Sequence, residues 1–131
     1  MVPVKLVFVD DDIDDRELIK DGLTALVIDH FLVLDSGRSL FAYLDKLSPS
    51  ELPEAIILDL NMPEMGGFDV LKKLKSIDRY RAISVYILTT STSTELKEQC
   101  NKEGAAGYFT KPNTLVELYS ILNDINTSVM E

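Results

Sequence analysis

Short runs of apolar residues alternate along this chain with longer segments in which apolar residues recur every three or four positions. The short runs end at polar or turn-forming residues, which is typical of strands buried on both faces of a sheet. Five strands are therefore predicted, at residues 4–9, 31–34, 55–58, 83–88 and 106–109.

The longer segments have the spacing of helices. At 13–27, Ile19, Leu23, Leu26 and Val27 fall on one face. Asp12 can cap the amino end of this helix, and Asp14 and Asp15 favour its dipole. Further helices are predicted before Ser48-Pro49, past Gly67, at 94–103 behind a Ser93 cap, and after Lys111-Pro112. Their apolar residues are Leu40, Leu44 and Leu47; Val70, Leu71, Leu74 and Ile77; Leu96 and Cys100; and Leu115, Leu118, Tyr119, Leu122 and Ile125.

Five strands that alternate with five helices indicate repeated β-α-β units. Such units form a parallel sheet with right-handed crossovers, which place helices on both faces. The predicted fold class is α/β, a three-layer doubly wound five-stranded parallel sheet.

Composition restricts the possible functions. The 131 residues suit one domain, and a net charge of −9 disfavours binding to a nucleic-acid backbone, so a protein partner is expected. The single cysteine, Cys100, cannot form an internal disulfide. No apolar run approaches the roughly 20 residues of a membrane span, and the amino end does not resemble a signal peptide. We expect a cytoplasmic protein without a membrane partner.

Candidate site residues follow four of the five predicted strands. Asp10 and Asp11 follow the first, Asp59 the third, Thr89 the fourth, and Lys111 comes shortly after the fifth. Because parallel strands end at the same edge of a sheet, these five side chains are expected to meet there.

The expected cluster has the chemistry of phosphoryl transfer to an aspartate. Crowded carboxylates need a cation, and Mg²⁺ suits a few oxygen ligands with retained waters; the main-chain carbonyl of Asn61 could add one oxygen. Asp59 could attack to form an acyl phosphate. Lys111 would pair with a phosphoryl oxygen, and the Thr89 hydroxyl would donate to another.

Four motifs carry a resemblance to a known family. They are Phe-Val-Asp-Asp-Asp at 8–12, Leu-Asp-Leu-Asn-Met-Pro at 58–63, Leu-Thr-Thr-Ser at 88–91 and Gly-Tyr-Phe-Thr-Lys-Pro at 107–112. Over essentially its whole length the chain resembles the CheY-like receiver domains of bacterial two-component response regulators, of the single-domain type. The resemblance implies the strand order 2-1-3-4-5.

The resemblance also implies roles at the metal site. Asp59 corresponds to the phosphoacceptor, Asp11 to a direct metal ligand, Asp10 to a ligand acting through water, and Asn61 to the carbonyl ligand. Where the family often has Asp before Gly67, this chain has Gly66, a departure that affects the start of a helix and not the chemistry.

A switch pair is implied as well. Thr89 corresponds to the hydroxyl that moves toward the phosphoryl group, and Tyr108 to the aromatic ring that turns inward behind it. The Lys111-Pro112 bond resembles a peptide that is cis in the family, an isomer that costs an X-Pro bond only about 0.5–1 kcal/mol.

The expected protein is one receiver domain over residues 1–131, with no output domain. By the resemblance it takes its phosphoryl group from a sensor histidine kinase or a histidine phosphotransfer protein, and a weaker likeness points to regulators that serve phytochrome-type kinases. It then acts as a switch and not as an enzyme. The helix at 94–103, the strand at 106–109 and the last helix form the expected face for a downstream protein, and the chain is a monomer or a homodimer through that face.

Other interpretations fit the residues less well. An EF-hand needs Gly where this chain has Asp15 and Glu where it has Asp21. A flavodoxin-like phosphate loop would be repelled by the acids after the first strand. A haloacid-dehalogenase-type phosphatase needs a second Asp at Asn61 and a cap domain, and a degenerate receiver would lack one of the acids, Thr89 or Lys111.

Overall fold

The computed structural model describes residues 3–130 and contains a five-stranded sheet in the order β2-β1-β3-β4-β5. All four neighbouring pairs are parallel. This confirms the fold class and the strand order. The strands are β1 (Leu6–Val9), β2 (Phe31–Leu34), β3 (Ala55–Leu58), β4 (Ser84–Thr89) and β5 (Gly107–Thr110).

The register of the central strands places their carboxyl ends side by side. Val9, the last residue of β1, lies opposite Leu58, the last residue of β3. The residues that follow, Asp10 and Asp59, are therefore adjacent, and the N–H of Asp59 donates to the carbonyl of Val9 at 3.1 Å. Parallel pairing alone brings together two carboxylates from distant parts of the chain.

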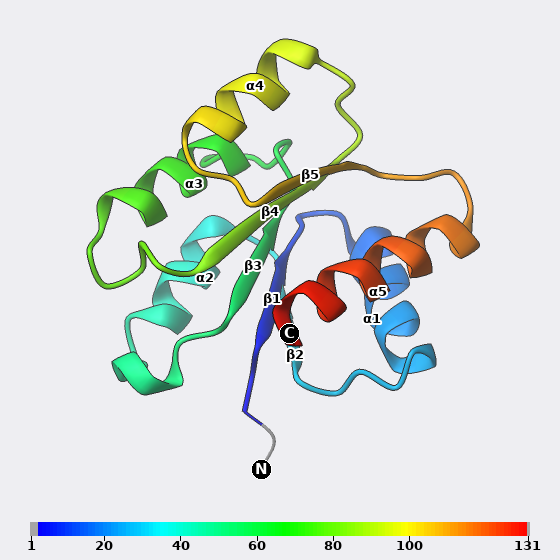
Figure 1. Cartoon of the computed structure of the whole chain (residues 1–131), viewed down its shortest axis with the longest axis horizontal. Helices are drawn as coiled ribbons and strands as arrows, with labels where there is room; N and C mark the ends of the chain where they lie inside the picture. Colours follow the sequence, from blue (N-terminus) through cyan, green and yellow to red (C-terminus); the bar gives the residue numbers. More distant parts are fainter. Residues whose placement is uncertain (1–2, 131) are drawn as a thin grey trace.

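Helices cover both faces of the sheet (Figure 1). α1 and α5 pack side by side on one face, and α2, α3 and α4 lie on the other. The five helices are α1 (Ile13–Ala25), α2 (Gly37–Leu44), α3 (Gly67–Ser76), α4 (Thr94–Lys102) and α5 (Leu115–Met130).

Within residues 3–130, no helix is long and apolar enough to span a membrane.

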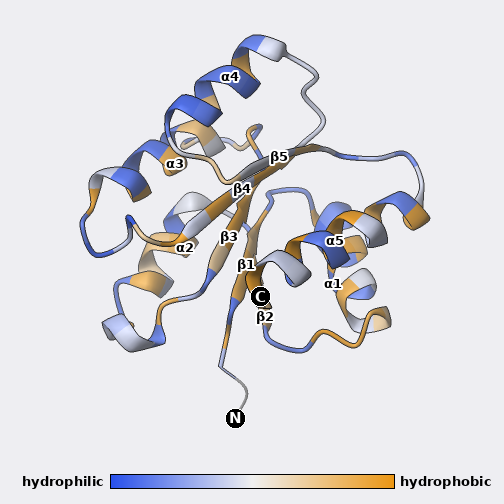
Figure 2. Cartoon of the chain, in the orientation of Figure 1, coloured by the Kyte–Doolittle hydropathy of each residue, from blue (hydrophilic) through white to orange (hydrophobic). Residues whose placement is uncertain are grey.

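Strand residues alternate between two buried cores, as the period of a strand requires. Figure 2 shows largely apolar strands between helices that carry both polar and apolar residues. Leu6 and Phe8 face α1 and α5, whereas Val7 and Val9 face α2 and α3. The first core includes Ile19, Leu23, Ala55, Ile57, Leu118, Leu122 and Ile125; the second includes Leu40, Leu44, Ile56, Leu58, Val70, Leu71, Leu74, Ile87 and Cys100.

The predicted caps of α1 and α4 are confirmed. The side chain of Asp12 accepts from the N–H of Asp15 at 3.0 Å, and the side chain of Ser93 accepts from the N–H of Leu96 at 3.2 Å. Each bond satisfies one of the amide groups that a helix leaves unpaired at its amino end.

α1 ends at Ala25 and not at Val27 as predicted. Val27 has a left-handed backbone with φ 60°, and its side chain is 89% exposed. The N–H groups of Val27 and Ile28 donate back to the carbonyls of Thr24 and Leu23, which is the Schellman pattern that closes a helix. Helical periodicity continued two residues beyond the helix because Leu26 and Val27 happened to fit it.

Other boundaries differ by a few residues. β1 begins at Leu6, opposite Phe31 of β2, and not at residue 4 as predicted. The N–H groups of Lys5 and Leu6 both donate to the carbonyl of His30. α2 ends at Leu44, and Leu47 follows in a turn whose N–H donates three residues back to Leu44. A short 3₁₀ helix, η1 (Pro49–Glu51), comes next.

The prediction of a cis peptide bond at Lys111-Pro112 is wrong, since no cis peptide occurs in residues 3–130. The chain passes from β5 into the segment before α5 with the trans isomer that X-Pro bonds ordinarily favour.

Candidate functional site

The carboxyl ends of β1 and β3 bring three carboxylates together. Asp10, Asp11 and Asp59 each offer an oxygen, and these oxygens lie within 4.8 Å of one another. Asp10 and Asp59 are only 2% and 6% exposed, whereas Asp11 is open to solvent. All three predicted acids therefore meet at one edge of the sheet, with one of them accessible from outside.

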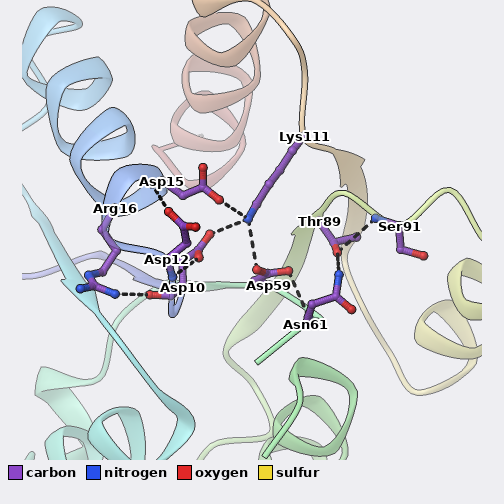
Figure 3. Close-up of polar contacts among 9 residues, drawn as sticks. All are labelled: Asp10, Asp12, Asp15, Arg16, Asp59, Asn61, Thr89, Ser91 and Lys111. Atoms are coloured by element: carbon purple, nitrogen blue, oxygen red, sulfur yellow. Dashed lines mark hydrogen bonds and ion pairs between the residues drawn. The ribbon is translucent and has the colours of Figure 1, made fainter. Parts of the chain in front are cut away.

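Lys111 reaches this group from the segment after β5 (Figure 3). Its Nζ lies 2.7 Å from Oδ2 of Asp10 and 3.1 Å from Oδ2 of Asp59. It also lies 2.8 Å from Oδ2 of Asp15, in the first turn of α1. Lys111 therefore lies with the acids at the sheet edge, as predicted, and a fourth carboxylate joins the cluster.

Asp15 and Arg16 were missed by sequence reasoning, which gave Asp15 only a role in the dipole of α1. Arg16 donates from Nη1 to the carbonyl of Asp10 at 3.0 Å and so ties α1 to the end of β1. A signal for Asp15 was present, because it is the third residue after the Asp12 cap and helical side chains tilt toward the amino end of the helix. A carboxylate at that position points back toward the end of β1.

The cluster has more negative than positive charge. The cluster contains four carboxylates, those of Asp10, Asp11, Asp15 and Asp59, and one ammonium group, that of Lys111. Burial raises the pKa of the Asp10 carboxyl above its ordinary value, despite its hydrogen bonds from Lys111 and the Asp12 amide. Burial alone would lower the pKa of Lys111, but its hydrogen bonds to Asp10 and Asp15 outweigh burial and raise the pKa. Lys111 is therefore charged at neutral pH, and one cation does not balance the acids.

The surroundings of Asp59 fix its position. Its Oδ1 accepts from the N–H of Asn61 at 3.1 Å. Gly67, the first residue of α3, lies against its main-chain carbonyl so closely that a Cβ at this position would overlap the oxygen. Glycine is thus required at 67 because α3 starts in contact with the backbone of the candidate acceptor.

Thr89 and Tyr108 are connected through Ser91. Thr89 is fully buried, and its Oγ1 accepts long hydrogen bonds from Nδ2 of Asn61 (3.5 Å) and the N–H of Ser91 (3.4 Å). The hydroxyl of Tyr108 donates to the carbonyl of Ser91 at 3.3 Å. The predicted switch residues are thus linked by one loop residue, and Thr89 is linked to the Asp59 side of the cluster through Asn61.

The oxygen donors fit a hard divalent cation. Mg²⁺ and Mn²⁺ prefer carboxylate, carbonyl and water ligands, and the excess negative charge of Asp10, Asp11 and Asp59 favours a cation. The carbonyl of Asn61, the fourth expected ligand, remains a prediction.

A hollow of about 130 Å³ lies beside the cluster, between α1 and the segment that joins β5 to α5. Asp15 and Lys111 line it together with Pro112 and apolar residues of α1 and α5. The Asp15–Lys111 pair is therefore at the margin of the site, next to solvent.

Comparisons with known proteins agree with this geometry. The family model of the response regulator receiver domain matches residues 6–123. The chemotaxis protein CheY1 of Helicobacter pylori is 32% identical over 111 residues, which cover 85% of this chain and 87% of the relative. The response regulator Rcp1 of Synechocystis is 30% identical, covering 98% of this chain and 90% of the relative.

Solved structures show the same fold. The Mn²⁺-bound form of Rcp1 has a TM-score of 0.82 at 29% identity and covers 95% of this chain and 93% of its own. The phosphorylated cyanobacterial phytochrome response regulator RcpA has a TM-score of 0.84 at 27% identity, with 98% and 95% coverage. One relative thus carries a divalent metal and the other a phosphoryl group.

Proposed function

This chain belongs to the family of response regulator receiver domains, and on that premise we propose that Asp59 accepts a phosphoryl group and that the modified protein signals by contacting another protein. One observation carries the proposal: the buried carboxylate of Asp59 has Lys111 3.1 Å away and Asp10 and Asp11 within 4.8 Å. The donor is a sensor histidine kinase or a histidine phosphotransfer protein. The likeness to RcpA favours a phytochrome-type kinase, acting in the cytoplasm.

In the proposed reaction a carboxylate oxygen of Asp59 attacks the phosphorus of a phosphohistidine. An O–P bond forms, the N–P bond breaks, and the histidine nitrogen leaves with the electron pair. Lys111 stabilises the negative charge on the phosphoryl oxygens, and the Thr89 hydroxyl donates to one of them once it turns toward Asp59.

Asp10, Asp11, Asp59 and the carbonyl of Asn61 are the residues that would hold Mg²⁺. A bound Mg²⁺ supplies positive charge that offsets the carboxylates and the transferring group. The chain's own contribution is to fix these oxygens through the β1–β3 register, the Arg16 contact to Asp10 and the close approach of Gly67.

The signal leaves the site through Thr89 and Tyr108. When Thr89 turns toward the phosphoryl group, Ser91 loses its hydrogen bond to Oγ1, and the loop that carries the Tyr108 contact shifts. Tyr108 lies in β5 next to α4, so we assign the changing surface to α4, β5 and α5. A downstream protein or a second copy of this chain binds there.

Acetyl phosphate, a small phosphodonor, tests the proposal. The full chain incubated with acetyl phosphate and Mg²⁺ is expected to gain the mass of one phosphoryl group, and Asp59→Asn is expected to gain none. Asp69→Asn, which removes an exposed carboxylate at the start of α3, is the matched control and should label normally. Labelling that persists in Asp59→Asn would refute the assignment.

A further inference from the structure

The ammonium group of Lys111 has three hydrogens, and three carboxylates surround it. Its distances to Asp10, Asp15 and Asp59 are 2.7, 2.8 and 3.1 Å. A lysine ammonium donates at most three hydrogen bonds, so each carboxylate accounts for one donor. The shortest two contacts are to residues other than the acceptor.

Asp15 differs from the other two partners of Lys111. Asp10 and Asp59 belong to the group of carboxylates with oxygens within 4.8 Å of one another, and Asp15 does not. In the proposed reaction Asp10 would help to hold the metal, and Asp59 becomes an acyl phosphate, a mixed anhydride that carries the phosphoryl group. Asp15 is the one partner whose chemistry stays the same from start to finish.

The backbone around Asp15 is held in place. Its N–H donates to the Asp12 cap at 3.0 Å, and the next residue, Arg16, binds the carbonyl of Asp10. The first turn of α1 is thereby tied to the end of β1. Figure 3 shows Asp15 on one side of the Lys111 ammonium and Thr89 on the other.

We propose that Asp15 is a positioning residue that anchors Lys111 beside Asp59, including when Asp10 would hold a metal and Asp59 carries the phosphoryl group. The inference rests on the proposed function of Asp59 and deepens it. Without this anchor, the four-carbon stem of Lys111 could turn into the neighbouring hollow, whose lining includes Asp15 and Lys111.

Two effects of Asp15 oppose each other, and the structure indicates which is larger. Its negative charge disfavours an anionic phosphoryl group, whereas its contact with Lys111 holds the needed cation in place. The side chain of Asp15 is 35% exposed, so water screens its charge at a distance, while the Lys111 side chain is only 14% exposed and its contacts are close. Anchoring therefore outweighs repulsion.

Initial rates of labelling by acetyl phosphate at fixed Mg²⁺ test the inference. Asp15→Ala is expected to lower the rate by roughly tenfold, because a misplaced catalytic group is costly. Asp15→Asn keeps an oxygen acceptor and is expected to recover part of the loss. Asp14→Ala removes the same charge from an exposed position in the same turn and should remain within about twofold of the unmodified chain.

A double-mutant cycle separates positioning from a general charge effect. In a Lys111→Ala background, Asp15→Ala is expected to cause no further loss. An equal loss in both backgrounds, or Asp15 variants that label as fast as the unmodified chain or faster, would overturn the inference. Unmodified protein that takes up no label would instead refute the proposed function, so the two failures are distinct.

A measurement on the metal-free protein adds an independent readout. The ammonium hydrogens of a lysine held by three carboxylates exchange slowly enough to give an Hζ–Nζ NMR correlation. We expect this signal from Lys111 in the unmodified chain and in Asp14→Ala, and its loss in Asp15→Ala at an unchanged thermal midpoint. A persistent signal in folded Asp15→Ala would contradict the anchor.

Discussion

Oδ2 of Asp59 lies 3.1 Å from Nζ of Lys111, although 52 positions separate the two residues in the chain. β3 ends directly before Asp59, and β5 ends directly before Lys111. β4 lies between these strands in the sheet, so the Lys111 side chain must extend back across the end of β4 to contact Asp59. The N–H of Lys111 donates to the carbonyl of Thr89 at 2.7 Å, which fixes the backbone position from which the Lys111 side chain extends.

Removing the charge of Lys111 is expected to impair phosphoryl uptake. Lys111→Met keeps most of the stem and loses the ammonium, and should lower the rate of labelling by acetyl phosphate at least about tenfold. Lys111→Arg should not restore the rate, because a planar guanidinium cannot reproduce three contacts around one nitrogen. Labelling of Lys111→Met at the normal rate would contradict the role of the lysine.

Divalent metal is expected to stabilise the fold. A ligand at about 100 times its dissociation constant adds roughly 2.7 kcal/mol to the free energy of unfolding, so saturating Mg²⁺ should raise the thermal midpoint by several degrees. The comparison uses NaCl at matched ionic strength. Asp11→Asn, at the exposed member of the carboxylate group, should fold normally and lose the Mg²⁺-dependent rise. An equal rise in this variant would place the metal elsewhere.

The proposed switch predicts a change that crosses from the site to α4 and β5. Beryllofluoride with Mg²⁺ mimics an aspartyl phosphate, and should shift amide NMR signals from Thr89 to Leu122. Thr89→Ala lacks the hydroxyl that links the site to Ser91, so the shifts at Tyr108 and in α4 should shrink while those beside Asp59 remain. Unchanged signals from Thr89 to Leu122 in the unmodified chain would rule out the switch.

Val27 is expected to destabilise the folded chain. A left-handed conformation costs an L-residue about 1–2 kcal/mol, and the exposed side chain of Val27 recovers little by packing. α4 ends in the same hydrogen-bond pattern with Gly104 at the equivalent position, φ 98°. Val27→Gly removes this conformational strain, but glycine also makes the unfolded chain more flexible, which cancels part of the gain in stability.

The net gain for Val27→Gly in the free energy of unfolding is therefore about 0.5–1 kcal/mol by urea denaturation. Val27→Ala keeps a Cβ and should gain less. A glycine variant that is less stable than the unmodified chain would show that Val27 makes contacts that offset its strain.

Much of the fold and the site was predictable from local pattern. Buried parallel strands are continuous apolar runs, so β2 and β3 were predicted to the residue, and the position of Asp59 at a strand end followed from them. Because parallel strands share an edge, Asp10, Asp59 and Lys111 could be expected to meet without knowing which strands were neighbours. The strand order itself came from family resemblance, since apolar runs do not encode their partners.

What local pattern could not predict depends on side-chain direction and on backbone conformation. Asp15 was assigned to the helix dipole because its contact with Lys111 spans 96 positions of sequence. The end of α1 was misplaced because Val27 adopts a conformation that glycine usually occupies. In both cases the observed arrangement, a long-range contact for Asp15 and a left-handed backbone for Val27, differs from what the residue's local preference predicts.

Chemical mapping of the phosphorylated position tests the central claim most directly. The chain is treated with acetyl phosphate and Mg²⁺, then with sodium borohydride, which reduces an aspartyl phosphate to homoserine, and its peptides are sequenced by mass spectrometry. We predict homoserine at position 59 and its absence when Mg²⁺ is chelated before labelling. Homoserine at Asp10, Asp11 or Asp15 instead, or none in chain that has gained the phosphoryl mass, would contradict the assignment of Asp59 as the acceptor.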